Sequence, residues 1–83
     1  MTKQIVKPNQ FAVGHVERKT GDVLDVELSL YDGQKELFLI FDSREAALTY
    51  MRNAVRRDRQ IECWLEDHSG RHLITMDYKG EVK

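Results

Sequence analysis

Apolar and polar residues alternate with a period of two along much of the chain, which predicts strands with one buried face. The clearest stretch is residues 24–30, and Asp32 and Gly33 then form a pair that tolerates the positive φ angles of a hairpin turn. Residues 35–41 return as a second strand. The turn places three apolar pairs on one side of the sheet: Leu28 with Leu37, Val26 with Leu39, and Leu24 with Phe41.

A second hairpin is predicted where residues 60–67 and 71–78 join through Ser69–Gly70. Its register pairs Leu65 with Ile74, Cys63 with Met76, and Ile61 with Tyr78. An earlier strand over about residues 11–18 turns through Thr20–Gly21 into the first clear strand, and it places Phe11 and Val13 beside the core.

A helix from about Ser43 to Arg57 is predicted between the two hairpins. Asp42 and Glu45 have the spacing of a capping box. Apolar residues then recur at helical intervals, namely Ala47, Tyr50, Met51, Ala54 and Val55.

The element order is therefore β-β-β-α-β-β, which predicts an α+β fold: a two-layer sandwich of about five antiparallel strands with one helix on one face. A chain of 83 residues makes a single domain over residues 1–83. We expect residues 1–9 and 79–83 to be frayed or peripheral, because they contain little that could pack.

Composition indicates a globular protein of a reducing compartment. Hydrophobic residues make up 41% of the chain, and Cys63 is the single cysteine, so no internal disulfide forms. Residues 1–8 lack the apolar run of a signal peptide, and no apolar stretch is long enough to cross a membrane. We expect a cytoplasmic protein without a membrane partner.

The residue patterns do not favour catalysis. Residues 67–69 read Asp-His-Ser, but consecutive side chains diverge and cannot form a catalytic triad. Glu62 and Glu66 lie four residues apart on one strand, further apart than paired glycosidase carboxylates. Nothing adjacent in the sequence activates His15.

Metal and cofactor sites are not favoured either. His68 and His72 flank the second predicted turn, whereas Cys63 should point into the core. The five glycines are scattered singly, so no phosphate-cradling loop exists. We expect no catalytic residue, no metal, no cofactor and no small-molecule substrate.

The predicted registers leave large apolar side chains on the sheet face opposite the helix. Phe38, Ile40 and Trp64 point outward there. Acidic residues surround them, namely Asp25, Glu27, Glu36 and Glu62. Apolar anchors with a polar rim are typical of protein interfaces.

The favoured function is therefore a small protein-binding module, an inhibitor, adaptor or subunit. Its interface residues would be Phe38, Ile40, Trp64, Glu27 and Glu62. The partner is a second copy, giving a homodimer, or a separate protein. The alternative is that Ile5 and Val6 of the amino-terminal segment cover this face.

The helix carries a second candidate surface. Residues 43–59 contain five arginines and two acidic residues, a net charge of +3 that leaves −4 for the rest of a chain whose total is −1. The anion or nucleic-acid candidates are Arg52, Arg56, Arg57 and Arg59. Cations at a helix carboxyl end also complement the helix dipole, which explains part of this pattern without a ligand. Nucleic-acid binding through this stripe is the runner-up function.

Overall fold

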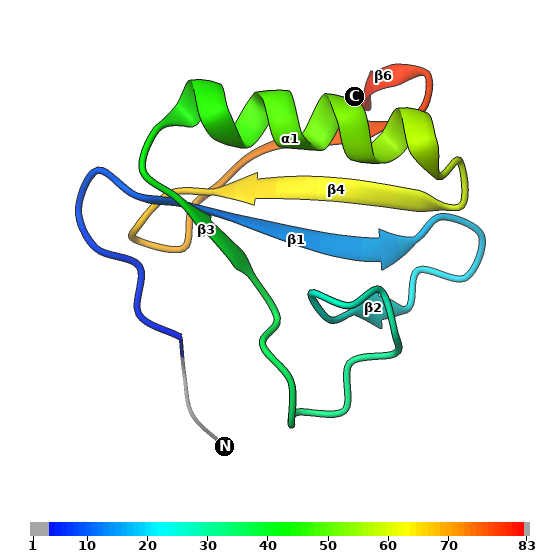
Figure 1. The fold of residues 1–83 in the computed structure, drawn as a ribbon, viewed down its shortest axis with the longest axis horizontal. Coiled ribbons are helices and arrows are strands. Elements are labelled where there is room, and N and C mark those ends of the chain that lie inside the picture. The colour runs from blue at the N-terminus through cyan, green and yellow to red at the C-terminus, as the bar shows by residue number, and fades with distance from the viewer. Residues whose placement is uncertain (1–3, 83) are drawn as a thin grey trace.

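The structure, a computed structural model that describes residues 4–82, confirms an α+β fold in which one helix packs on one face of an antiparallel sheet of six strands (Figure 1). The elements in chain order are β1 (Phe11–Glu17), β2 (Val23–Leu24), β3 (Leu39–Phe41), α1 (Arg44–Arg57), β4 (Ile61–Glu66), β5 (His72–Asp77) and β6 (Gly80–Val82). No helix within residues 4–82 is both long enough and apolar enough to span a membrane.

The sheet is built around β1. The strand order is β2-β1-β4-β5-β6, and β3 also pairs with β1. One edge of β1 pairs with β4 from Ala12 to Glu17, while the other edge is divided: its first part pairs with β3 and its last part with β2. Residues 79–82, expected to be frayed or peripheral, form a turn and the edge strand β6.

The second hairpin has the predicted register over most of its length. Cys63 pairs with Met76 and Leu65 with Ile74, and a bulge follows between Leu65 and Glu66. The predicted pair of Ile61 with Tyr78 is not part of the ladder, because β5 ends at Asp77 and Tyr78 enters the turn to β6.

The helix also lies where the sequence predicts it, but its cap differs. The side chain of Ser43 accepts a hydrogen bond from the Ala46 backbone N–H at 3.1 Å, so Ser43 rather than Asp42 is the N-cap. Asp42 instead accepts a hydrogen bond from Gln10 at 2.9 Å. The buried helix residues are those of the predicted stripe, namely Ala47, Met51, Ala54 and Val55.

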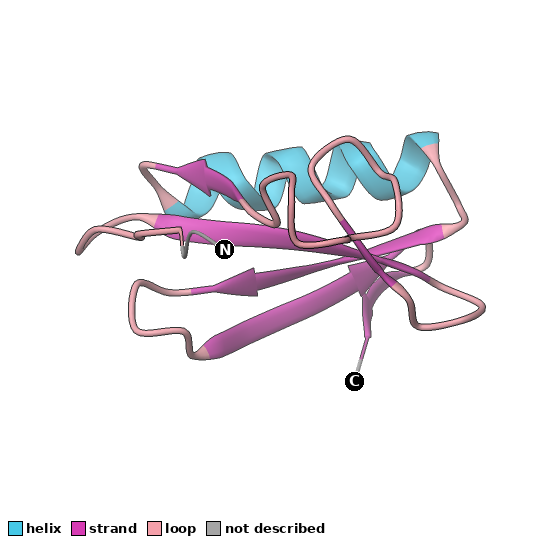
Figure 2. Ribbon diagram, turned by 90° about the horizontal axis from the view of Figure 1, so that it is seen from below, coloured by secondary structure: helices cyan, strands magenta, loops and turns pink. Residues whose placement is uncertain are grey.

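The hydrophobic core lies between α1 and the sheet face that it covers. Met51 and Val13 are fully buried, as is Leu65 of β4. Figure 2 shows α1 lying along one side of the sheet, and the described part of the chain contains no second helix to cover the other side. That uncovered side leaves room for an interaction surface.

The predicted hairpin of residues 24–30 with residues 35–41 is wrong. β2 ends at Leu24, and the return segment pairs with β1 instead, Leu39 with Val13 and Phe41 with Phe11. None of the three predicted pairs, Leu28 with Leu37, Val26 with Leu39 and Leu24 with Phe41, forms in this sheet. Leu28 and Leu30, predicted to be buried, are 41% and 64% exposed.

The side chain of Asp25 explains why the strand stops. Asp25 is only 2% exposed, and its Oδ1 accepts hydrogen bonds from the backbone N–H groups of Glu27 at 2.8 Å and Ser29 at 3.1 Å. Bonds of this kind compete with a strand ladder for the backbone donors. The turn that results holds Leu28 at a positive φ of 63°.

We predict that Asp25→Ala lowers the free energy of unfolding by about 1–3 kcal/mol, because it removes the acceptor of two backbone donors in a partly buried loop. Urea denaturation followed by circular dichroism measures this change. Asp32→Ala is the matched control, since Asp32 accepts one comparable bond from Gln34 in an exposed turn. Equal losses in the two variants would show that the burial of Asp25 has no special importance.

Candidate interaction surfaces

The strand residues that point away from α1 form a continuous surface, here called the outer face. The registers place thirteen residues on it: Ala12, Gly14, Val16, Val23, Ile40, Glu62, Trp64, Glu66, His72, Thr75, Asp77, Gly80 and Val82. Two of the predicted interface residues, Ile40 and Trp64, therefore lie where the sequence places them, and both are half-buried.

Trp64 is held rigidly at the centre of the outer face. Its ring lies against Gly14 so closely that a Cβ atom at that position would come within 3.0 Å of three ring atoms. The Phe38 ring contacts Trp64 edge-on, with 5.8 Å between ring centroids. The indole N–H donates a hydrogen bond to Glu66 at 2.6 Å. Sequence reasoning missed the role of Gly14, although a lone glycine inside a strand is itself a sign of close approach.

The amino-terminal segment is anchored beside Phe38 through Gln4. The Gln4 side chain accepts hydrogen bonds from the backbone N–H groups of Leu37 and Phe38 at 2.9 and 2.7 Å, and it donates one to the Phe38 carbonyl at 2.9 Å. Ile5 is 82% exposed, so it does not cover the outer face, whereas Val6 is half-buried.

The acidic residues are only partly where the sequence predicts them. Glu62 lies on the outer face, two residues before Trp64 in β4, as predicted. Glu27 does not: it is exposed in the loop after β2 and forms an ion pair with Lys35. Asp25 is buried, and Glu36 lies in the loop before β3, where it accepts a hydrogen bond from Gln4. These three corrections follow from the early end of β2.

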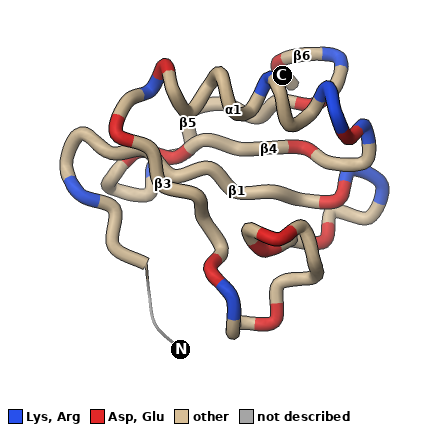
Figure 3. Tube along the Cα trace, in the orientation of Figure 1, with Lys and Arg blue, Asp and Glu red and all other residues tan. Residues whose placement is uncertain are grey.

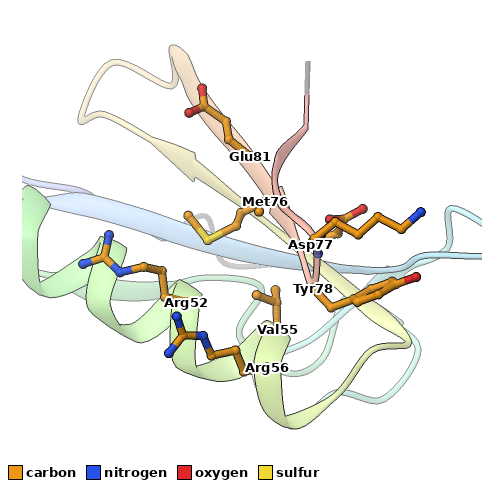
Figure 4. Close-up of a pocket in the computed structure, with 9 residues that line it drawn as sticks. Arg52, Val55, Arg56, Met76, Asp77, Tyr78 and Glu81 are labelled. Carbon is orange, nitrogen blue, oxygen red and sulfur yellow. Dashed lines mark hydrogen bonds between the residues drawn. The ribbon is translucent and has the colours of Figure 1, made fainter.

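The arginines of α1 lie on a different part of the molecule. Arg52, Arg56 and Arg57 are all exposed. Arg52 and Arg56 line a groove of about 280 Å³ between the helix and the turn from β5 to β6, with Tyr78 on the other wall (Figure 4). The guanidinium of Arg59, in the loop after the helix, lies 5.2 Å from the centre of the Tyr78 ring.

No carboxylate of the described residues forms an ion pair with these arginines. Within residues 4–82, the pair of Lys35 with Glu27 is the one ion pair found. Lys and Arg positions gather at the end of the molecule where α1 stops and β5 turns into β6 (Figure 3). The sequence predicted the helical stripe but missed the other residues beside Tyr78, because Arg18 and Lys79 come from distant parts of the chain.

A buried polar cluster lies under the helix. His15 is fully buried, and its Nε2 forms a hydrogen bond of 2.7 Å with the Tyr50 hydroxyl. Among the described residues, no hydrogen-bond partner reaches His15 Nδ1. Burial lowers the pKa of His15, an effect that nearby Asp25 opposes in part, and burial raises the pKa of Tyr50.

The burial of this cluster limits its chemistry. Desolvation raises the pKa of the Cys63 thiol to about 12, so the nucleophilic thiolate is scarce at neutral pH. His15 and Cys63 are both fully enclosed, and a substrate in solution does not reach them. No group of three or more potential metal ligands occurs within residues 4–82.

Comparison of the chain with protein-family models, with curated proteins and with solved structures finds no match. The two surfaces described above are therefore interpreted from their own geometry and charge.

We predict that Gly14→Ala lowers the free energy of unfolding by about 1–3 kcal/mol, because the new methyl group overlaps the Trp64 ring. Alanine otherwise stabilises a strand relative to glycine by about 0.5–1 kcal/mol. The same substitution in a Trp64→Ala background should therefore be neutral or stabilising. Urea denaturation of the four proteins measures this coupling, and additive effects would contradict the close contact.

We predict that the free energy of unfolding falls as the pH drops below about 6.5, because the unfolded chain then protonates His15 while the folded protein, whose His15 pKa is lowered, does not. The slope contributed by this residue reaches at most about 1.4 kcal/mol per pH unit. Urea denaturation between pH 5 and 8 measures it.

His15→Gln should remove this part of the pH dependence. His72→Ala should retain it, because His72 is exposed and lies outside the buried cluster. An unchanged pH profile in His15→Gln would show that another group is responsible.

Proposed function

We propose that this chain is a non-enzymatic protein-binding module that contacts its partner through the outer face. Phe38, Ile40 and Trp64 form the apolar centre, and Glu62 and Glu66 form part of the rim. The observation that carries this proposal is the fixed Trp64 ring, which lies against Gly14 on a sheet face that no helix of residues 4–82 covers.

A fixed aromatic ring is an effective anchor for a partner. Tryptophan is among the residues that contribute most to binding at protein interfaces. Trp64 is restrained by Gly14 beneath it, by Phe38 at its edge and by the hydrogen bond to Glu66. The Trp64 side chain therefore loses little conformational entropy on binding, and the cost of ordering it reduces the binding free energy very little.

The charge of the outer face indicates the chemistry of the partner. Glu62, Glu66 and Asp77 are its charged strand residues, and none of the strand residues that the registers place there is lysine or arginine. Stacking two outer faces around a twofold axis brings six carboxylates together, which disfavours a homodimer. We therefore assign the face to a different protein whose contact surface carries lysine or arginine around an apolar centre.

The proposed compartment is the cytoplasm. Cys63 is a buried free thiol. A small domain that relies on a packed core instead of disulfides suits a reducing environment.

Site-specific photo-crosslinking in cells of the source organism tests the proposal. A photoreactive amino acid at Thr75, which pairs with Trp64 across the outer face, should give a discrete adduct with another protein. The same group at Asn53, on the exposed side of α1, should not give that adduct. Phe38→Ala should reduce the amount of the Thr75 adduct by about tenfold. This corresponds to a loss of about 1.4 kcal/mol of binding free energy.

Light scattering of the purified protein distinguishes a partner from a second copy. A monomer at micromolar concentration together with the Thr75 adduct supports the proposal. A stable dimer that Phe38→Ala dissociates would replace the separate partner with self-association. Identical crosslinks from Thr75 and Asn53, or an adduct unaffected by Phe38→Ala, would contradict binding through the outer face.

A further inference from the structure

Tyr78 lies at the centre of a group of cations that come from three separate parts of the chain. The guanidinium of Arg18, just after β1, is 5.0 Å from the centre of the Tyr78 ring. The guanidinium of Arg59 is 5.2 Å away, and the ammonium of Lys79 is 5.6 Å away. A significant cation–π contact occurs roughly once per 70–80 residues in proteins. Three on one ring is therefore an unusual concentration of charge.

Hydrogen bonds fix this arrangement. The backbone N–H of Arg18 donates to the Gln60 carbonyl at 2.6 Å. The side-chain Nε of Arg18 donates to the Arg59 carbonyl at 2.9 Å, which joins the end of β1 to the loop after α1. The backbone N–H of Lys79 donates to Asp77 at 2.8 Å and sets the turn that carries Tyr78.

The positive charge at Tyr78 is not neutralised within the described chain. Among the described residues, no carboxylate lies within ion-pairing distance of Arg18, Arg59 or Lys79. Two nearby acidic residues cap turns: Asp58 accepts from the Gln60 backbone N–H, as Asp77 does from Lys79. The ring attracts each cation but carries no net charge, so the mutual repulsion of the cations remains.

The groove extends this charge along the helix. Arg52 and Arg56 occupy the helix wall, and Tyr78 and Glu81 occupy the opposite wall (Figure 4). Asp77 and Glu81 are the acidic residues among those that line it. Three cations of the groove, Arg52, Arg56 and Lys79, thus stand against two carboxylates, and Arg18 and Arg59 add their charge at the Tyr78 wall.

We propose that this surface binds the phosphate backbone of a single-stranded nucleic acid. The guanidinium fork matches phosphate oxygens, and guanidinium planes next to an aromatic ring also provide stacking surfaces for unpaired bases. The groove volume of about 280 Å³ lies just below the range of small-ligand pockets, which begins at about 300 Å³. It suits one strand rather than a duplex. An acidic peptide would also carry negative charge for the arginines, but it has no nucleobase that could stack on the guanidinium planes.

The test is fluorescence anisotropy of a labelled single-stranded oligothymidylate of 15 nucleotides, titrated with the full chain at several salt concentrations. We expect binding at low salt that weakens steeply as salt rises, with a log–log slope of about −0.7 for each phosphate contact. Arg59→Ala should weaken binding by about tenfold and make the slope shallower by about 0.7. This variant removes an exposed side chain and leaves the carbonyl that Arg18 contacts.

Matched variants separate this site from general electrostatic attraction. Arg44→Ala removes another exposed arginine, at the opposite end of α1, and should have less than a twofold effect. Tyr78→Ala should weaken binding, whereas Tyr78→Phe, which keeps the ring, should not. Phe38→Ala should leave oligonucleotide binding unchanged. If the nucleic-acid proposal fails, the protein-binding role of the outer face is therefore not affected. Thermal unfolding of each variant confirms that it is folded.

Four results would overturn the inference. The first is no anisotropy change with 100 μM protein at about 50 mM salt, where electrostatic binding to nucleic acid is strong. The second is an equal loss in Arg44→Ala and Arg59→Ala. The third is tighter binding of the matching duplex than of the single strand. The fourth is displacement of the oligonucleotide by polyglutamate at an equal concentration of negative charge, which would assign the surface to an acidic protein.

Discussion

The pairing of β1 with three other strands is the constraint on which the rest of the structure depends. β4 occupies one edge of β1 along six residues, and β2 and β3 divide the other edge. With both edges paired, β1 leaves no backbone donor or acceptor open along most of its length. The helix can then pack across β1, β4 and β5 as a single surface, and the core forms between them.

The central position of β1 also gives two adjacent residues opposite roles. His15 faces the helix and forms the buried hydrogen bond with Tyr50, whereas Gly14 faces the other way and accommodates the Trp64 ring. Successive side chains of a strand point to opposite faces, so the polar element of the core and the aromatic centre of the outer face are linked through the same backbone. A change in the register of β1 would displace both.

The protein separates its charges in space although its net charge is only −1. The outer face carries Glu62 and Glu66 around an aromatic centre, while cations gather around Tyr78 at one end of the sheet. Oppositely charged surfaces with little mutual neutralisation attract different classes of partner. The two proposed surfaces therefore suit different classes of partner, and Asp77 lies at the boundary between them.

The sequence by itself determined the elements whose pattern is local. The helix at residues 44–57 follows from its apolar stripe, and the hairpin of β4 with β5 follows from alternating residues on both sides of a short turn. The outward placement of Trp64 comes from the same alternation. In each case neighbouring residues in the chain supply both the pattern and the partner.

Only the tertiary structure decided which strands pair over a distance and which side chains meet there. Residues 24–30 have strand alternation, yet Asp25 turns the chain by local hydrogen bonds, and β3 pairs with β1 instead. Glu27 leaves the predicted interface for the same reason. Arg18 reaches Tyr78 because the strands before them, β1 and β5, both pair with β4. Alternation sets the face of the sheet on which a side chain lies. It does not set the partner strand, because a free strand edge can pair with any compatible strand. The packing of the whole sheet decides among these possible partners.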